Sequence, residues 1–456
     1  MHEQMTILRN VLVDGTIKGA RIRGTSVDVD IKDGHIESIH ESRRLDEPNE
    51  SKSGRSFSAS GGLLAPSLCH PHVHLDKAFI LSHPRYRHLQ ITEGTFQEAM
   101  ELTSEAKKSF TRDDLIQRGQ RLIEESWQAG VTHMRAFVEV DEIVGMSCVE
   151  AGAELKKMAA EKGLCHVQLC AFAQLPLHPS DASGDKIRSL MQQAMQPQHL
   201  VDVVGSTPYV EKDRSDEIAN IKWMIDLALK HDKHLDFHLD YNVNPDTEPT
   251  VFEVVRLLKE SEWAIRTRKC IVFGHCTRQL YFDMSQWQHL ASQIGDLPIS
   301  FVGLPTSDLY MMKTPSQQRP TTIMESRTTL PIPQMIQKYG LNCAIGMNNI
   351  GNAFTPQGVC DPLFLANLGV AIYHTGTVKD ARLLYECIST RARAAIGLAS
   401  SSHDGDYDFT LDILPGQRAD LILFQPPPEG FEGEENIEDK VYYYSAAPRT
   451  ALWSGN

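Results

Sequence analysis

The sequence predicts an α/β protein whose body is a (β/α)8 TIM-type barrel and whose two chain ends form a small β-sandwich domain. Three observations predict this: eight short apolar segments alternate with amphipathic helical segments, both ends show strand patterns, and histidines fall where barrel strands would end. Alternating strands and helices form parallel sheets through right-handed crossovers, and eight such units favour a closed barrel over an open sheet. We expect the β-domain in residues 1–64 and 405–456 and the barrel in residues 65–404.

Both chain ends have the pattern of short strands. Residues 7–40 alternate between apolar and polar positions, and Asp33-Gly34 is a hairpin turn signal. Near the other end, Ala419–Phe424 is a short apolar run typical of a buried strand. Because both ends are β-rich, we expect them to meet in one sheet, with the polar stretches Glu41–Arg55 and Pro426–Asp439 as surface loops.

The middle of the chain supplies the barrel. Helical periodicity is visible over Leu115–Ile123 and Ile221–Ala228, and Asp380–Ile396 predicts a helix that stops at Gly397. The eight predicted strands are Leu63–Cys69, Thr132–Val138, Val167–Phe172, Val201–Ser206, His234–Phe237, Cys270–Phe273, Ile299–Val302 and Cys343–Ile345.

Composition narrows the class of protein. The 456 residues carry a formal net charge of −14, which argues against nucleic acid or an anionic membrane surface as a partner. No window is apolar for long enough to span a bilayer, and the N-terminus shows no signal peptide pattern. Nine cysteines without paired spacing suit reduced thiols. We therefore expect a cytoplasmic protein with a small-molecule substrate, and homo-oligomerisation stays open.

The segment His-Pro-His-Val-His-Leu-Asp-Lys at residues 70–77 predicts a metal site. In an extended strand, side chains two residues apart share a face, so His72 and His74 point the same way, about 7 Å apart. Neutral imidazoles are ligands suited to zinc or iron. A histidine-rich polar turn is the alternative interpretation, but the position after a buried apolar run favours the metal site.

Chemically capable residues fall where the barrel strands end, and in such barrels the active site lies at the carboxyl ends of the strands. Four histidines on three strands are more consistent with one pocket than with chance. The strand-end residues, in order, are His72, His74, Arg135, Glu139, Gln174, Ser206, Tyr209, His238, Asp240, His275, Thr306, Asp308, Asn348 and Asn349. Arg135 and Glu139 are expected to form an orienting ion pair with each other.

The chain resembles the amidohydrolase superfamily of metal-dependent hydrolases, and most closely its cytosine deaminase-like branch. The resemblance covers nearly the whole chain, and the first motif is the most specific. The matching segments are His72-Val-His-Leu-Asp-Lys77, Ala171-Phe-Ala-Gln174, Val203-Val-Gly205, His238-Leu-Asp240, Gly274-His-Cys-Thr277, Gly346-Met-Asn-Asn349 and the late Pro415-Gly-x-x-Ala-Asp-Leu421.

The resemblance implies a hydrolase acting on a non-peptide C–N bond of a small cyclic amide or amidine. It implies that His275 hydrogen-bonds the attacking hydroxide or the developing tetrahedral centre, and that Gln174 recognises an amide or amidine edge of a heterocycle. Zinc is the first choice of cofactor, with iron and manganese as alternatives. One divalent ion would be held by His72, His74, His238 and Asn348.

Two residues depart from the pattern of the branch. Asn348 stands where an aspartate usually binds the metal and takes a proton from water, and an amide is neutral and cannot act as a general base. Tyr241 stands where the branch reads His-x-Asp-Glu, and an ordinary phenol titrates near 10, which makes it a poor base at neutral pH. Both proton-handling carboxylates are therefore replaced.

Three interpretations follow. In the favoured one the protein is still a metal hydrolase in which His275, Asp240 or Asp308 has taken over proton transfer, with assistance from Tyr241 or Asp240. In the second, a metal-free or weakly metal-dependent isomerase, cyclase or lyase uses Tyr241 as an acid; in the third, the protein only binds. The four retained histidines favour the first. Substrate contacts are predicted from Lys77, Gln174, Asp308 and Asn349, and a salt bridge with an acid such as Asp76 is the alternative for Lys77.

Overall fold

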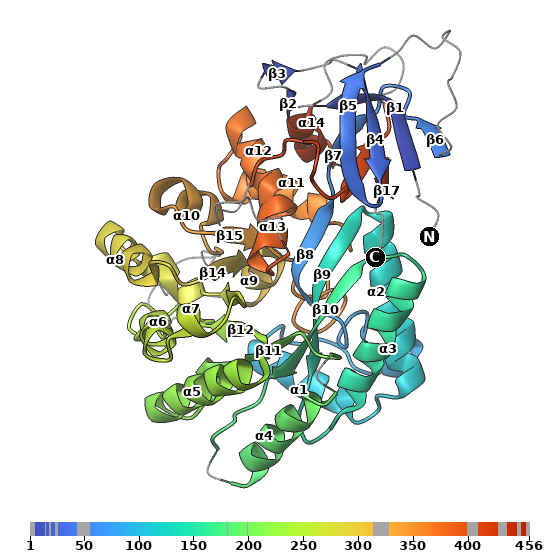
Figure 1. The fold of residues 1–456 in the computed structure, drawn as a ribbon. Coiled ribbons are helices and arrows are strands. Elements are labelled where there is room, and N and C mark those ends of the chain that lie inside the picture. The colour runs from blue at the N-terminus through green and yellow to red at the C-terminus, as the bar shows by residue number, and fades with distance from the viewer. Residues whose placement is uncertain are drawn as a thin grey trace.

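The computed structural model describes residues 5–13, 15–17, 20–22, 26–42, 55–179, 181–197, 199–312, 328–398, 409–426, 436–444 and 448–452. Within them, a parallel barrel surrounded by helices carries a separate sheet at one side (Figure 1). The predicted boundary at 404/405 and most of the predicted loop Glu41–Arg55 lie outside the described residues, so the division into domains stays a prediction.

Eight parallel strands form the barrel, paired in chain order, as predicted. A parallel bridge between Val73 and Asn348 joins the first strand to the segment after the last one and closes the ring. The strands are β8 (Leu68–His74), β9 (Val131–Glu139), β10 (His166–Ala173), β11 (Val203–Ser206), β12 (His234–Leu239), β13 (Ile271–His275), β14 (Ile299–Gly303) and β15 (Cys343–Ile345).

The second sheet has seven strands from both ends of the chain, as predicted. C-terminal β16 pairs antiparallel with β7, and β7 pairs parallel with N-terminal β1. A two-stranded sheet of β2 and β3 lies beside it (Figure 1). The strands are β1 (Met5–Val13), β2 (Gly15–Ile17), β3 (Ala20–Ile22), β4 (Ser26–Lys32), β5 (His35–Glu41), β6 (Arg55–Ser58), β7 (Leu63–Pro66), β16 (Leu421–Phe424) and β17 (Arg449–Leu452).

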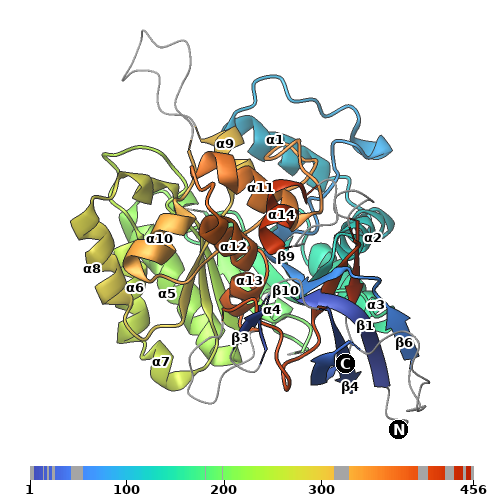
Figure 2. The same cartoon turned by 90° about the horizontal axis from the view of Figure 1, so that it is seen from above.

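Helices cover the outside of the barrel, and in the view from above they ring the strands (Figure 2). Several begin at side-chain caps that satisfy free N–H groups: Thr111 accepts from Asp114, and Asp283 and Gln286 form a reciprocal capping box. The helices are α1 (Phe96–Lys107), α2 (Arg112–Gln128), α3 (Ser147–Glu161), α4 (Ser183–Ala194), α5 (Arg214–His231), α6 (Val251–Glu260), α7 (Trp263–Arg266), α8 (Met284–Ile294), α9 (Pro305–Met311), α10 (Ile332–Tyr339), α11 (Pro362–Ile372), α12 (Val378–Cys387), α13 (Thr390–Ala395) and α14 (Ile437–Tyr442).

Two predicted elements are divided in the structure. The predicted strand Leu63–Cys69 is wrong as a single barrel strand, because Leu63–Pro66 belongs to the second sheet and the barrel strand begins at Leu68. The predicted helix Asp380–Ile396 is interrupted after α12, where the carbonyl of Ile388 accepts from the N–H of Cys69 in β8. The end of the predicted helix is correct, since Gly397 has a positive φ of 76°.

Among the described residues, no helix is both long enough and apolar enough to cross a membrane. The largest apolar core lies between the barrel strands and the helices, and it includes Ile422 and Phe424 of β16. The second sheet also has a smaller core of its own. One strand therefore contributes to the packing of both parts of the molecule.

Candidate metal centre and active site

Three histidines from two strands converge inside the carboxyl end of the barrel. His72 and His74 come from β8, and His238 comes from β12. The Nε2 atom of His238 lies 3.1 Å from Nε2 of His72 and 3.3 Å from Nε2 of His74. The ligand atoms of all three lie within 4.8 Å of one another, and this group is the one among the described residues with the geometry of a metal site.

Two glycines leave room for the His72 imidazole. A Cβ at Gly274 would lie 3.2 Å from Cε1 of His72, and a Cβ at Gly346 would lie 3.1 Å from Cβ of His72. Both contacts are tighter than ordinary van der Waals distance. The glycines that begin the segments 274–277 and 346–349 therefore let neighbouring strands approach the first ligand closely.

The three imidazoles are neutral. Burial lowers the pKa of His72, His74 and His238 well below the ordinary value, and the nearby cations lower it further. Neutral imidazole is the form that binds a metal, because the ligand nitrogen must carry a free lone pair.

The donor set fits a divalent metal ion. Zinc bound tetrahedrally at 2.0–2.1 Å places neighbouring nitrogens roughly 3.3–3.4 Å apart, close to the separations found here. A fourth donor is available, because Oδ1 of Asn348 is buried without a hydrogen-bond partner and the amide lies beside the His72 ring. The structure thus supports a divalent metal, with its identity left to experiment.

Hydrogen bonds of both its backbone and its side chain hold Asn348 in place. Its N–H donates to the carbonyl of His72 at 3.0 Å, and its own carbonyl accepts from the N–H of His74 at 2.8 Å. Its Nδ2 atom donates to Oγ of Ser307 at 2.8 Å, which leaves Oδ1 as the end of the amide facing the histidines. The backbone has a φ of 61°, a strained conformation typical of functional sites.

His275 ends β13 beside the three-histidine group. Its Nδ1 atom lies 3.0 Å from Oδ1 of Asp308, while Oδ2 of Asp308 accepts from the hydroxyl of Thr329 at 2.6 Å. This pairing directs Nε2 of His275 to the pocket. Asp308 was predicted to contact the substrate, but both of its oxygens are occupied and it is not among the residues that line the pocket.

The ring of Tyr241 packs against the ring of His275 at an interplanar angle of 32°. Their ring centroids are 3.7 Å apart, and the tyrosine hydroxyl is 3.5 Å from the carbonyl of Ser307. Burial raises the pKa of Tyr241 well above its ordinary value. The phenol is therefore neutral at physiological pH and cannot take the place of a glutamate as a base.

Asp240 does not reach the pocket. Its carboxylate accepts from the backbone N–H groups of Thr250 and Val251 at 2.8 and 3.2 Å and from Nε2 of Gln279 at 2.5 Å. These contacts place the carboxylate at the start of α6. Asp240 was predicted to handle protons, but its position makes it a support for the loop after β12.

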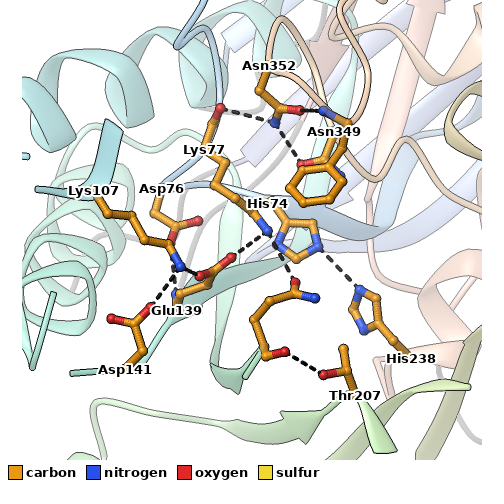
Figure 3. Close-up of polar contacts among 12 residues, drawn as sticks. His74, Asp76, Lys77, Lys107, Glu139, Asp141, Thr207, His238, Asn349 and Asn352 are labelled. Atoms are coloured by element: carbon orange, nitrogen blue, oxygen red, sulfur yellow. Dashed lines mark hydrogen bonds and ion pairs between the residues drawn. The ribbon is translucent and has the colours of Figure 1, made fainter. Parts of the chain in front are cut away.

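Lys77 also lines the pocket, and it belongs to a buried cluster of charges (Figure 3). Its Nζ is 2.6 Å from Oε1 of Glu139 and 3.5 Å from Oε1 of Gln174. Lys107 pairs with the other oxygen of Glu139 and with Asp141. The salt bridge considered for Lys77 therefore exists, but with Glu139 rather than Asp76. Burial lowers the pKa of Lys77 to about 8.

The predicted ion pair between Arg135 and Glu139 is wrong. Arg135 lies earlier in β9 and donates to Oδ2 of Asp236 at 2.8 Å, inside the barrel. Glu139 ends the strand and faces the two lysines. Alternation along β9 cannot reveal this, because every residue from Val131 to Glu139 is buried.

The pocket above the histidines is narrow and lined by amides and aromatic rings. It has a volume of about 20 Å³ for the centres of water molecules, enough for one or two waters. Phe96 of α1 was not anticipated from the sequence, since nothing in an amphipathic helix marks the residue that reaches over the barrel mouth. The lining residues are His74, Lys77, Phe96, Gln174, Tyr209, His238, Tyr241, His275, Asn348, Asn349 and Phe354.

Comparisons with known proteins agree with this architecture, although no family model matches the sequence. The chain is 21% identical over 369 residues to the N-isopropylammelide isopropyl amidohydrolase of Pseudomonas sp. strain ADP, covering 80% of each chain. It is similar to the structure of 5-methylcytosine deaminase from Klebsiella pneumoniae, with a TM-score of 0.78 and 20% identity over 99% of this chain and 96% of that one. It also resembles an adenosine deaminase from Xanthomonas campestris with bound zinc, with a TM-score of 0.65 and 14% identity over 100% and 92% of the chains.

The chain therefore has the fold of these deaminases, and its sequence is similar to an amidohydrolase over 80% of both chains, in agreement with the resemblance noted from its motifs. The similar proteins include a 5-methylcytosine deaminase and an N-isopropylammelide isopropyl amidohydrolase, in agreement with the predicted resemblance to the cytosine deaminase-like branch.

Proposed function

We propose that this protein is a metal-dependent hydrolase that cleaves a non-peptide C–N bond of a small nitrogen heterocycle, a cyclic amide or amidine. The observation that carries the proposal is the convergence of three neutral imidazoles with His275 at the carboxyl end of the barrel. The relatives whose names describe deaminases and amidohydrolases of ring compounds support the same reaction class.

The metal centre is proposed to consist of His72, His74 and His238, with Oδ1 of Asn348 as the fourth donor. Zinc is the proposed ion, because a set of three imidazoles and one amide oxygen suits it, and because a structurally similar protein carries zinc. A divalent ion there supplies Lewis-acid polarisation of the substrate and lowers the pKa of water toward 7.

Proton handling falls to His275. Asn348 is neutral and Tyr241 stays a phenol, so neither accepts a proton at neutral pH. With Nδ1 directed at Asp308, Nε2 of His275 can take a proton at the pocket and return it to the leaving nitrogen. Asp308 is a positioning residue that fixes the ring orientation and stabilises the imidazolium.

Gln174 and Asn349 are proposed to orient the ring of the substrate. Both line the pocket; the hydroxyl of Thr207 donates to the backbone carbonyl of Gln174 at 2.8 Å, and Oε1 of Gln174 lies 3.5 Å from Nζ of Lys77. The reaction in which Tyr241 acts as a proton donor without metal is less well supported, because its hydroxyl is directed at the carbonyl of Ser307.

The test is metal content together with C–N hydrolysis. Protein purified without chelator should hold close to one divalent ion per chain, measured by inductively coupled plasma mass spectrometry. It should release ammonia or an amine from some members of a panel of cyclic amides and amidines. The double variant His72→Ala/His74→Ala should lose both properties, whereas His289→Ala, on the exposed face of α8, should keep both. Absence of metal after incubation with zinc, iron or manganese would overturn the proposal.

A further inference from the structure

The pocket lining contains one lysine and no carboxylate among the described residues. Lys77 is the charged member, and the other lining side chains are imidazoles, amides, phenols and phenyl rings. At the two positions where the cytosine deaminase-like pattern has acids, this chain has Asn348 and Tyr241. The pocket has thus lost two negative charges relative to that pattern while Lys77 faces it.

The carboxylates nearest to the pocket are turned away from it. Asp240 accepts from the start of α6, and Asp308 is divided between His275 and Thr329. Glu139 lies behind Lys77 and is shared with Lys107 (Figure 3). A ligand above the histidines therefore meets the ammonium group of Lys77 rather than its acidic partner.

A hydrogen-bond chain adds a second donor to the same wall. Oδ1 of Asn352 accepts from the backbone N–H groups of Phe354 and Thr355, at 3.0 and 3.2 Å. Nδ2 of Asn352 must then donate, and it does so to the carbonyl of Lys77 at 3.1 Å and to Oδ1 of Asn349 at 2.8 Å. The orientation of Asn349 is fixed in turn, and its NH2 group is left for a ligand.

We infer that the ring compound bound here is an anion: a planar nitrogen heterocycle whose negatively charged edge lies against Lys77 and Asn349. This inference rests on the proposed function, since it names the substrate class for the same site. The shared chemistry is a delocalised ring anion, which arises either from an ionised cyclic imide or from a carboxylate attached to the ring.

The absence of charge on the proposed metal ligands also favours an anionic substrate. A divalent ion held by three neutral imidazoles and one amide would keep its full charge, whereas an aspartate at position 348 would cancel part of that charge. An anionic ligand restores the balance. A pocket with this charge also disfavours protonated amidines, because like charges raise the free energy of binding.

The test compares ligands of matched shape and different charge. Barbiturate, ionised at pH 7, is paired with uracil, which is neutral; orotate is paired with its neutral carboxamide. Dissociation constants are measured by isothermal titration calorimetry on zinc-loaded and on chelator-treated protein. We expect the anion of at least one pair to bind about tenfold more tightly or better than its neutral partner. The pair that shows the difference identifies the source of the charge.

Variants of the two lysines distinguish a direct contribution of Lys77 to anion binding from a general effect of disturbing the charge cluster. Lys77→Met should remove most of the preference for the anion, and Lys77→Arg should retain part of it. Lys107→Met is the matched control, because it takes away the other lysine of Glu139 but does not line the pocket. If Lys77→Met fails to fold, Asn349→Asp tests the same wall, and it should weaken anion binding about tenfold or more while sparing uracil.

Equal or tighter binding of the neutral member in both pairs would overturn the inference, and so would binding of none of the four at millimolar concentration. The same experiments distinguish failure of this inference from failure of the proposed function. If anions are preferred but no ring C–N bond is hydrolysed, the inference stands and the hydrolase proposal falls. If neutral rings are hydrolysed and anions are not bound, the hydrolase stands and the inference falls.

Discussion

At the scale of single residues, the proposed ligand Asn348 would set the charge of the metal centre. Its amide is held by Ser307, and its orphaned oxygen lies beside His72. A neutral fourth donor leaves the site with less affinity for a dication than a carboxylate would. It would also leave the ion its full power to activate water, because no ligand charge would offset the charge of the ion.

Asn348→Asp should therefore increase zinc affinity by about tenfold or more, since an anionic donor replaces a neutral one. The pocket can accept the change, because the Ser307 hydroxyl can rotate to donate to the carboxylate. Competition with a chelator of known affinity measures the effect. Asn348→Leu, which has no donor, should shift affinity in the opposite direction. If both variants match the natural protein, Asn348 is not a ligand.

His275→Gln should reduce turnover on any hydrolysed substrate by about 10²–10⁴-fold, because a positioned acid–base group is lost. Metal content should stay unchanged, since His275 is outside the three-histidine group. Asp308→Asn should have a smaller effect on turnover and should shift the pH profile, because Asp308 acts through His275. Loss of metal in His275→Gln would instead make this residue a ligand.

At the scale of elements, histidines that begin strands serve structure rather than catalysis. His234 opens β12, and its Nδ1 accepts from the N–H of Cys270 at 3.0 Å. Burial lowers its pKa to about 2. A proton on Nδ1 of His234 would face the N–H of Cys270, so the folded protein keeps this imidazole neutral.

The acid stability of the fold should reflect His234. Between pH 6.5 and about 2 the unfolded chain binds a proton at this residue and the folded chain does not, so stability falls as the pH drops below 6.5. The loss reaches about 2 kcal/mol at pH 5. His234→Asn, whose Oδ1 can replace Nδ1 as acceptor, should remove this part of the loss in urea unfolding at pH 7 and pH 5. The exposed His289→Asn should leave the pH dependence as it is.

Much of the element pattern was accessible from the sequence, and the exceptions have physical causes. Apolar strands and amphipathic helices mark the barrel, because its strands are buried on both faces. The division of residues 63–74 between two sheets was hidden, since both halves are equally apolar. The break after α12 was hidden too, because it arises from a backbone hydrogen bond to β8.

The histidines of the candidate site could be predicted from the sequence, because the strand pattern also shows where each strand ends. His72, His74, His238 and His275 stand at strand ends, and strand ends are countable along a chain. The direction in which a carboxylate points cannot be read from the sequence in the same way. Asp240 and Asp308 face away because of partners more than ten residues distant, namely Val251 and Thr329. The pairing of Lys77 with Glu139 likewise depends on strand register.

At the scale of the whole molecule, the second sheet and the barrel share packing through β16. Ile422 is fully buried and lies against Gly130, where an added Cβ would be 2.1 Å from its Cδ1. The adjacent Leu423 points to the other side, into the smaller core. Because side chains alternate between the two faces of β16, this one strand packs into both cores.

Ile422→Ala should lower the free energy of unfolding by about 2–5 kcal/mol, the range for truncating a buried aliphatic side chain. Leu423→Ala is the matched control and should have a smaller effect, because Leu423 is only partly buried. Urea unfolding followed by circular dichroism measures both. Equal effects would mean that the barrel does not depend on the second sheet.

A single residue, Ser67, separates β7 of the second sheet from β8, which carries His72 and His74. Its N–H donates to the carbonyl of Asp420, and its carbonyl accepts from Arg393, so this junction is clamped from both sides. The second sheet therefore cannot rotate relative to the barrel without moving His72 and His74, the two histidines of β8 in the proposed metal centre. The second sheet thus acts as a fixed mechanical anchor for the start of the strand that carries His72 and His74.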